Sequence, residues 1–127
     1  MYPTSEHAYQ AAKTTDIEIR KTVSLLPTPS AAKKFGNKKS KMIALRDDWE
    51  SVKVAIMHDI VTEKFKQNKV LRENLLLTDG YYLEEGNWWN DTFWGVCNGV
   101  GENNLGKLLM KIRDEELTNV RNSKAEA

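Results

Sequence analysis

The feature that most constrains the fold of this chain is an apolar repeat between Asp47 and Gln67. Five apolar residues recur there at roughly helical spacing: Trp49, Val52, Ile56, Ile60 and Phe65. Such spacing brings side chains onto one face of an α-helix, so the repeat predicts a long helix at the centre of the core. A chain of 127 residues suggests a single domain, because a domain of this size buries roughly two thirds of its unfolded surface.

Capping residues divide the rest of the chain into shorter helices. We expect further helices over residues 5–13, 16–26, 29–35, 69–78 and 103–117, with Thr4 or Ser5, Thr28 and Asn103 as caps. The segment YYLEE, residues 81–85, is the best strand candidate. The sequence therefore predicts a mainly α, compact single-domain fold over residues 1–116 with a minor β element. Residues 117–127 are expected to form a frayed or disordered tail.

Composition excludes several classes of protein. The formal net charge of +1 argues against a broad sequence-independent DNA-binding protein but leaves room for a local phosphate site. Cys97 is the only cysteine, so an internal disulfide is excluded, and neither a zinc site nor any other metal or cofactor is expected. The chain shows no membrane-spanning apolar run and no signal pattern, so we expect a cytoplasmic protein.

The first predicted helix carries three polar residues on one face. Glu6, Gln10 and Lys13 have the i, i+4, i+7 spacing that aligns side chains along a helix. This face can simply be solvated. Alternatively, Glu6 handles protons and Lys13 contacts an anion or acts as an amine nucleophile, which requires a lowered pKa.

Residues 87–106, NWWNDTFWGVCNGVGENNLG, combine aromatic rings, one acid and a glycine-asparagine loop. A tryptophan can pack in a core or stack on a nucleobase, and we expect at least one ligand contact among the three between Trp88 and Trp94. The run GVGENNLG leads into a helix, whose N-terminal N–H groups can hold a phosphate or pyrophosphate. A purely structural turn would need the same glycines.

Four separated segments resemble the NADAR (NAD- and ADP-ribose-associated) family in order and spacing. They are YPTSEHAYQAAK, W…VK…M…KF.QN, EGNWWNDTFWG and GENNLGKLLMKIR, and together they span most of residues 2–113. The resemblance implies an N-glycosidase, a hydrolase that cleaves the bond between ribose C1 and a nitrogen. It implies two substrate classes, which are phosphorylated intermediates of riboflavin synthesis and ADP-ribose attached to guanine in nucleic acid. No membrane partner is expected.

The resemblance also implies site residues. Glu6, Lys13 and Asp91 are expected to be catalytic. The resemblance implies substrate contacts from Glu85, Trp94, Asn104 and Gly106, and the helix face, the tryptophans and the glycine-asparagine run described above add Gln10, Trp89, Gly101 and Asn103. Arg113 matches the LM.IR segment. Family members usually begin with an LSNF-like motif and a strand before the first helix. Because this sequence starts almost on the first motif, we expect either a compact member, such as a phage could encode, or a member that lacks part of the pocket wall.

Two mechanisms and two non-enzymatic functions stay open at this point. In one mechanism Glu6 or Asp91 handles the proton while the other carboxylate stabilises positive charge at C1. In the other, Lys13 attacks C1 of the opened sugar and forms a Schiff base, and this route is slightly favoured for ADP-ribosyl substrates. A protein that binds or senses ADP-ribose or another NAD metabolite without turnover, or a scaffold, is the alternative. Both catalytic mechanisms require the first predicted helix to face the loop that contains Asp91.

Overall fold

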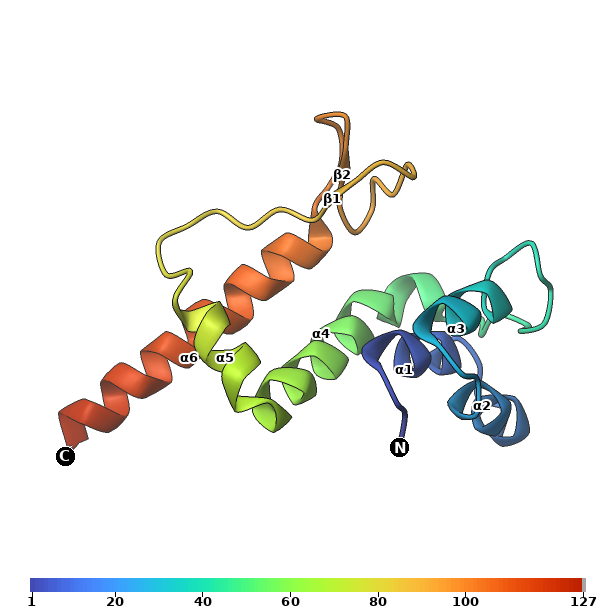
Figure 1. Ribbon diagram of the computed structural model, residues 1–127, viewed down its shortest axis with the longest axis horizontal. Helices are drawn as coiled ribbons and strands as arrows, with labels where there is room; N and C mark the ends of the chain where they lie inside the picture. The colour runs from blue at the N-terminus through green and yellow to red at the C-terminus, as the bar shows by residue number, and fades with distance from the viewer. Residues whose placement is uncertain (127) are drawn as a thin grey trace. The chain divides into compact units, whose positions relative to one another are not determined.

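The computed structural model describes residues 1–126, with side chains through Lys124. These residues form six helices and two short strands, shown in Figure 1. The elements are α1 (Ser5–Ala12), α2 (Ile17–Ser24), α3 (Pro29–Phe35), α4 (Trp49–Gln67), α5 (Lys69–Leu76), β1 (Gly86–Asn87), β2 (Val96–Cys97) and α6 (Asn104–Glu126). The prediction of a mainly helical fold with a minor β element is confirmed.

The residue contacts divide the chain into two compact units, Met1–Lys64 and Phe65–Ala127, named unit 1 and unit 2 here. The boundary falls within α4. The prediction that residues 1–116 form one domain stays a prediction. Neither of the long helices described, α4 and α6, is apolar enough to cross a membrane.

Unit 1 is organised around α1, which contacts both α2 and α3 (Figure 1). Three fully buried small residues, Ala11, Val23 and Ala32, form the core of this arrangement and let the helices approach closely. The helix ends follow from local chemistry. The Thr4 and Thr28 hydroxyl oxygens accept hydrogen bonds from backbone N–H groups three residues later, as the sequence predicts.

His7 is the largest fully buried side chain of unit 1, and sequence analysis assigned it no role. Its Nε2 lies 3.0 Å from the Leu26 carbonyl oxygen, and its Nδ1 lies 2.6 Å from the Thr4 hydroxyl. A carbonyl can only accept, so Nε2 carries a proton. His7 thereby ties α1 to the chain that follows α2.

The long helix α4 is less buried than its apolar repeat predicts. Trp49 and Val61 are buried, whereas Val52, Ile56, Ile60 and Phe65 are only partly covered. At the start of the helix Trp49 packs against Tyr9, with ring centroids 5.1 Å apart and planes tilted by 59°. This contact joins α1 to α4 within unit 1.

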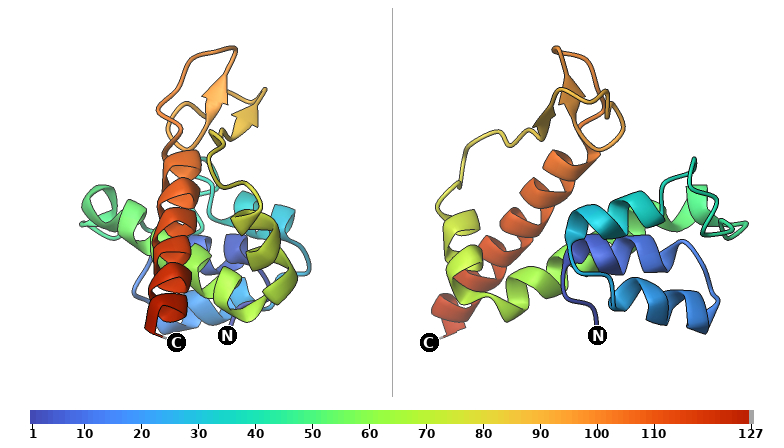
Figure 2. Two further views of the ribbon diagram at one scale, coloured as in Figure 1. Left: turned by 90° about the vertical axis from the view of Figure 1, so that its left-hand side faces the viewer. Right: turned by 45° about the vertical axis from the view of Figure 1, so that its right-hand side comes forward.

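In unit 2, α5 and α6 contact each other, and the chain from α5 to β1 runs along α6 (Figure 2). The strands β1 and β2 pair in parallel, with Gly86 opposite Val96 and Asn87 opposite Cys97. The predicted strand over residues 81–85 is wrong, because none of these residues lies in a strand, and only the Glu85 carbonyl accepts a hydrogen bond from β2, from the Val96 N–H at 2.7 Å. Side chains of α6 and of the residue before it, Asn103, hydrogen-bond the backbone of this segment instead.

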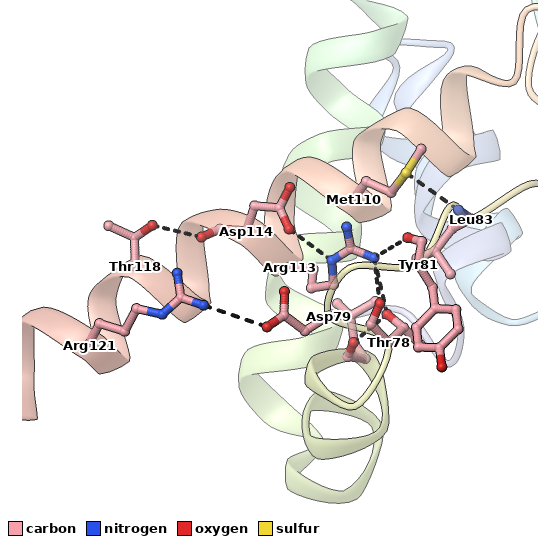
Figure 3. Close-up of polar contacts among 10 residues, drawn as sticks. Thr78, Asp79, Tyr81, Leu83, Met110, Arg113, Asp114, Thr118 and Arg121 are labelled. Atoms are coloured by element: carbon pink, nitrogen blue, oxygen red, sulfur yellow. Dashed lines mark hydrogen bonds and ion pairs between the residues drawn. The ribbon is translucent and has the colours of Figure 1, made fainter.

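Arg113 is the clearest case of a side chain that replaces a partner strand (Figure 3). Its buried guanidinium donates to the carbonyl oxygens of Thr78 at 2.9 Å and Tyr81 at 2.7 Å. Its Nε donates to the Asp114 carboxylate at 2.8 Å. Arg113 therefore fastens the chain after α5 to α6.

Helix α6 continues to Glu126, so the predicted end near Leu117 is wrong. Residues 117–126 contain no glycine or proline, and Arg121 pairs with Asp79 at 3.5 Å. The helix has no stop signal at Leu117 and gains a contact beyond it.

Candidate functional site

The first part of the candidate site lies at the end of α1 in unit 1. Lys13 caps this helix, and its Nζ donates to the Gly36 carbonyl oxygen at 3.0 Å. The same Nζ lies 5.7 Å from the centre of the Tyr9 ring. The amine is therefore half-buried between the end of α1 and the end of α3.

The residues before α4 hold the backbone of Lys13 in place. The Arg46 N–H donates to the Lys13 carbonyl at 2.8 Å, and the Arg46 guanidinium contacts the Ala12 carbonyl at 3.4 Å. Asp48 holds the same guanidinium from its other side at 3.0 Å. The position of Lys13 thus depends on residues more than thirty positions later.

Burial lowers the pKa of the Lys13 amine below its ordinary value, because desolvation disfavours the ammonium. The Glu6 carboxylate raises this pKa, and the positive charge of Lys53 lowers it further. A lowered pKa gives the amine a larger neutral, nucleophilic fraction at a given pH. Lys53 was missed by sequence analysis, although it is the lysine of the W…VK segment.

The helix face that carries Glu6, Gln10 and Lys13 is not fully solvated, because Gln10 is buried. Only 4% of its surface is exposed, and its Oε1 has no hydrogen-bond partner within the described residues. Gly36 lies directly against it, since a Cβ at Gly36 would collide with the Gln10 amide. A buried acceptor without a donor costs free energy, which identifies Gln10 as a candidate for accepting a hydrogen bond from a ligand.

The second part of the candidate site lies in unit 2 and is organised by Asn87. Its side-chain Nδ2 donates to the Glu85 carboxylate at 3.1 Å and to the Asp91 carbonyl at 2.8 Å. Its Oδ1 accepts from the Asp91 N–H at 3.0 Å. Asn87 therefore joins the two predicted site acids, which sequence analysis did not anticipate.

The Asp91 carboxylate also has a role in the fold of its loop. Its Oδ1 accepts hydrogen bonds from the backbone N–H groups of Phe93 at 3.2 Å and Trp94 at 2.9 Å. This is the usual way in which an aspartate stabilises a turn. The aspartate of the D..WG segment thus shapes the loop, whatever further role it has.

The tryptophans of this loop differ in exposure. Trp88 is 84% exposed and Trp89 46%, and their rings meet edge to face with centroids 5.7 Å apart. Trp94 is partly buried and packs edge to face against Phe93, with centroids 4.9 Å apart. Sequence analysis selected Trp89 and Trp94 and missed Trp88, which presents the most accessible ring.

The glycine-asparagine run before α6 makes internal contacts. The N–H groups of residues 102–105 donate to carbonyl oxygens of Thr92, Phe93, Trp94 and Gly95 at 2.7–3.3 Å. The expectation that this helix terminus offers free N–H donors to a phosphate is therefore wrong for residues 102–105. Gly101 lies in the same loop, and the Asn104 side chain adds a bond to the Phe93 carbonyl at 2.9 Å.

Asn103 precedes α6 as predicted, but its side chain contacts segment 82–85. Its Oδ1 accepts from the Glu85 N–H at 2.9 Å, and its Nδ2 donates to the Leu83 carbonyl at 2.9 Å. Gly106 makes this close approach possible, since a Cβ there would collide with the Asn103 amide. A structural role accounts for the contacts of both residues.

Within the described residues, no group of three or more His, Cys, Asp and Glu side chains is arranged to hold a metal ion. Cys97 is buried, with its Sγ 3.6 Å from Oδ1 of Asn90. Glu6, Gln10 and Lys13 belong to unit 1, whereas the other predicted site residues belong to unit 2. That the two groups face each other across one pocket stays a prediction.

Comparisons with known proteins assign the chain to one family. The chain is 41% identical over 115 residues to an N-glycosidase, YbiA, of Shigella boydii, covering 90% of this chain and 70% of that protein. It is 39% identical to an N-glycosidase of Nostoc punctiforme, covering 90% and 74% of the two chains. A riboflavin biosynthesis protein of Vibrio vulnificus is also 39% identical, covering 90% of this chain but 30% of that one.

A solved structure and a family model agree with these relatives. The NMR structure of Escherichia coli YbiA is similar with a TM-score of 0.83 at 37% identity, covering 93% of this chain and 69% of that chain. The model of the NADAR domain matches residues 1–117. The chain therefore belongs to the NADAR domain family.

Proposed function

We propose that this chain is an N-glycosidase that hydrolyses the bond between ribose C1 and a base nitrogen, with Lys13 as the nucleophile. The observation that carries the proposal is the half-buried Lys13 amine, whose pKa is lowered by burial beside the Glu6 carboxylate. The names of the N-glycosidase relatives support the reaction class. Ribosylated, phosphorylated bases are the substrates, either ADP-ribosylated guanine in nucleic acid or intermediates of riboflavin synthesis.

The proposed reaction begins with opening of the ribose ring: the bond from C1 to the ring oxygen breaks, the oxygen takes a proton from water, and C1 becomes doubly bonded to the base nitrogen. The neutral Lys13 amine then adds to C1 and forms a C–N bond. Glu6 takes a proton from the lysine nitrogen and passes it to the base nitrogen, and the bond from C1 to the base breaks as the lysine nitrogen forms a double bond to C1. Water then adds to the resulting imine at C1, which restores the free amine and releases the sugar.

The remaining site residues have binding roles in this proposal. Gln10 accepts a hydrogen bond from the substrate, because its buried Oε1 has no donor within the described residues. Trp89 and Trp94, together with the exposed Trp88, offer rings on which a base can stack. Glu85 and Asp91 bind ribose hydroxyls from the loop that Asn87 organises.

The decisive experiment is reductive trapping with borohydride during turnover. The protein is incubated with ADP-ribosylated guanine in an oligonucleotide and, separately, with the riboflavin intermediates. We expect base release and a covalent adduct on Lys13, identified by mass spectrometry. Turnover without an adduct would favour the mechanism with two carboxylates, Glu6 and Asp91.

The variant Glu6→Gln separates catalysis from binding. We expect it to bind substrate and release base slowly, because the proton acceptor beside the amine is lost. Base release at the wild-type rate would exclude Glu6 as the proton-handling group. If the wild-type protein binds ADP-ribose but releases no base from any of these substrates, it is a binding or sensing protein.

A further inference from the structure

A run of positive charge follows the candidate nucleophile in unit 1. Residues 33–41, named the lysine segment here, contain five lysines and no acid: Lys33, Lys34, Lys38, Lys39 and Lys41. All five are exposed. No aspartate or glutamate occurs from Val23 to Arg46. The lysine segment is therefore strongly basic, although the formal net charge of the whole chain is only +1.

The lysine segment lies next to the Lys13 amine. The Gly36 carbonyl at the middle of the segment accepts the hydrogen bond from Lys13 Nζ at 3.0 Å. Lys34 and Lys38 are each two residues from Gly36, so their Cα atoms lie within about 7 Å of its Cα. A substrate held at Lys13 is therefore within reach of several ammonium groups.

Hydrogen bonds give the lysine segment a defined backbone. The Ser40 hydroxyl donates to the Phe35 carbonyl at 2.6 Å and to the Asn37 carbonyl at 2.8 Å. The Asn37 side chain accepts from the Lys39 N–H at 2.9 Å. Because these bonds order the backbone before binding, less conformational freedom is lost when a ligand is bound.

We propose that the lysine segment binds the phosphate backbone of a nucleic acid strand that carries the modified base to Lys13. A lysine is a compact point charge that contacts phosphate without reading sequence. Five such charges along nine residues fit successive phosphates of a strand better than the phosphate of one nucleotide. The placement of the base at Lys13 rests on the proposed function, whereas the strand-binding surface does not.

Strand binding is tested without turnover. The variant Lys34→Gln/Lys38→Gln/Lys39→Gln is compared with the matched control Lys21→Gln/Lys69→Gln/Lys111→Gln, which removes the same charge from exposed positions elsewhere. Fluorescence anisotropy measures binding of an unmodified single-stranded oligonucleotide over a range of salt concentrations. Each lost phosphate contact lowers the log–log salt slope by about 0.7, so the segment variant should lose about 2 and the control almost nothing. Equal slopes in the two variants would overturn the proposal.

A second measurement distinguishes the phosphates of a nucleic acid strand from those of the modified nucleotide itself. The kcat/KM for base release is determined with ADP-ribosylated guanine in an oligonucleotide and with the corresponding free nucleotide. At moderate salt the segment variant should lose about 10-fold on the strand and keep its activity on the nucleotide. An equal loss on both substrates would mean that the lysines serve the substrate's own phosphates, which also overturns the proposal.

The two proposals can fail separately. Lysine-dependent strand binding without turnover of any substrate would refute the N-glycosidase proposal and support the strand-binding surface. Turnover combined with strand binding that does not depend on the lysine segment would leave the enzyme proposal standing and refute the inference about the segment.

Discussion

The two halves of the candidate site use polar side chains in different ways. In unit 2, hydrogen bonds join Asn87, Asp91 and Asn103 to backbone groups of the same loop or of the chain beside it. In unit 1, Gln10 has a buried oxygen without a partner within the described residues, and Lys13 has an amine whose pKa burial lowers. The polar side chains of this loop in unit 2 thus stabilise the fold, whereas Gln10 and Lys13 in unit 1 combine burial with a lowered amine pKa and an acceptor that is unpaired among the described residues.

Polar residues of a motif that this chain shares with its family can therefore stabilise the fold instead of contacting a ligand. The run GENNLG has the composition of a phosphate loop, yet the N–H groups of residues 102–105 bind carbonyl oxygens of the same unit. Substitutions in the two regions should therefore have different consequences. A change at Lys13 should affect the reaction rate first, whereas a change at Asn103 should affect stability first.

The largest effect is expected from Lys13→Met, which removes the nucleophile and keeps much of the side-chain volume. Loss of general acid–base help alone costs about 10²–10⁴-fold, and loss of the nucleophile should cost more than that. Initial rates of base release measure this loss. The control Lys21→Met changes an exposed lysine of α2 and should leave the rate unchanged. Comparable activity of Lys13→Met and wild type would contradict the assignment.

The next largest effect is expected from Asn103→Ala, but on stability. The substitution removes three side-chain hydrogen bonds: two of 2.9 Å, to the Glu85 N–H and the Leu83 carbonyl, and one of 3.2 Å, to the Tyr82 hydroxyl. Losses of this kind amount to about 3 kcal/mol of the free energy of unfolding. Urea denaturation measures the change. The control is Lys111→Ala on the exposed face of α6, whose free energy of unfolding should stay within about 0.5 kcal/mol of the wild-type value. An unchanged unfolding midpoint would refute the structural role.

A smaller effect is expected from Gly36→Ala, which should change both stability and substrate binding in unit 1. The added Cβ collides with the Gln10 amide and must displace it or the Gly36 carbonyl that binds Lys13. Overpacking of this kind costs about 1–3 kcal/mol. We expect both a lower unfolding midpoint and a higher KM. A variant with wild-type stability and kinetics would show that neither contact matters.

The smallest effect is a shift in pH dependence. Because the Lys13 pKa is lowered, the rate should rise with pH as the amine loses its proton, over a range below the ordinary pKa of lysine. Lys53→Met removes a charge that lowers this pKa, so the rise should move to higher pH. Glu6→Gln removes a charge that raises it and should move the Lys13 titration, followed by NMR, to lower pH. Shifts in the opposite directions would exclude this electrostatic coupling.

The helices of unit 1 could be predicted because their ends depend on neighbouring residues. Thr28, Pro29 and Gly36 mark α3 within a short stretch of sequence, and the structure places its ends there. Segment 81–85 has the composition of a strand, but most of its backbone partners are side chains, those of Asn103, Met110 and Arg113. Propensity could not show this, because the competing groups come from distant positions in the chain.

The candidate site was predictable in its residue types but not in its electrostatics. The spacing of Glu6, Gln10 and Lys13 predicted a shared helix face. The lowered pKa of Lys13 depends on burial and on Lys53, which lies forty residues later. Sequence alone cannot give the burial of a side chain at the end of a helix, since neighbouring elements create it.

The parallel pairing of β1 with β2 has a consequence for how the protein folds. Parallel strands usually need a connection of a dozen residues or more, but here Gly86 pairs with Val96 only ten residues later. Closing a loop of about ten residues takes on the order of 10–100 ns, far less than assembling a long-range sheet. The turn held by Asn87 and Asp91 lies inside this loop. The loop can therefore form early in folding, before the contacts between residues far apart in the sequence.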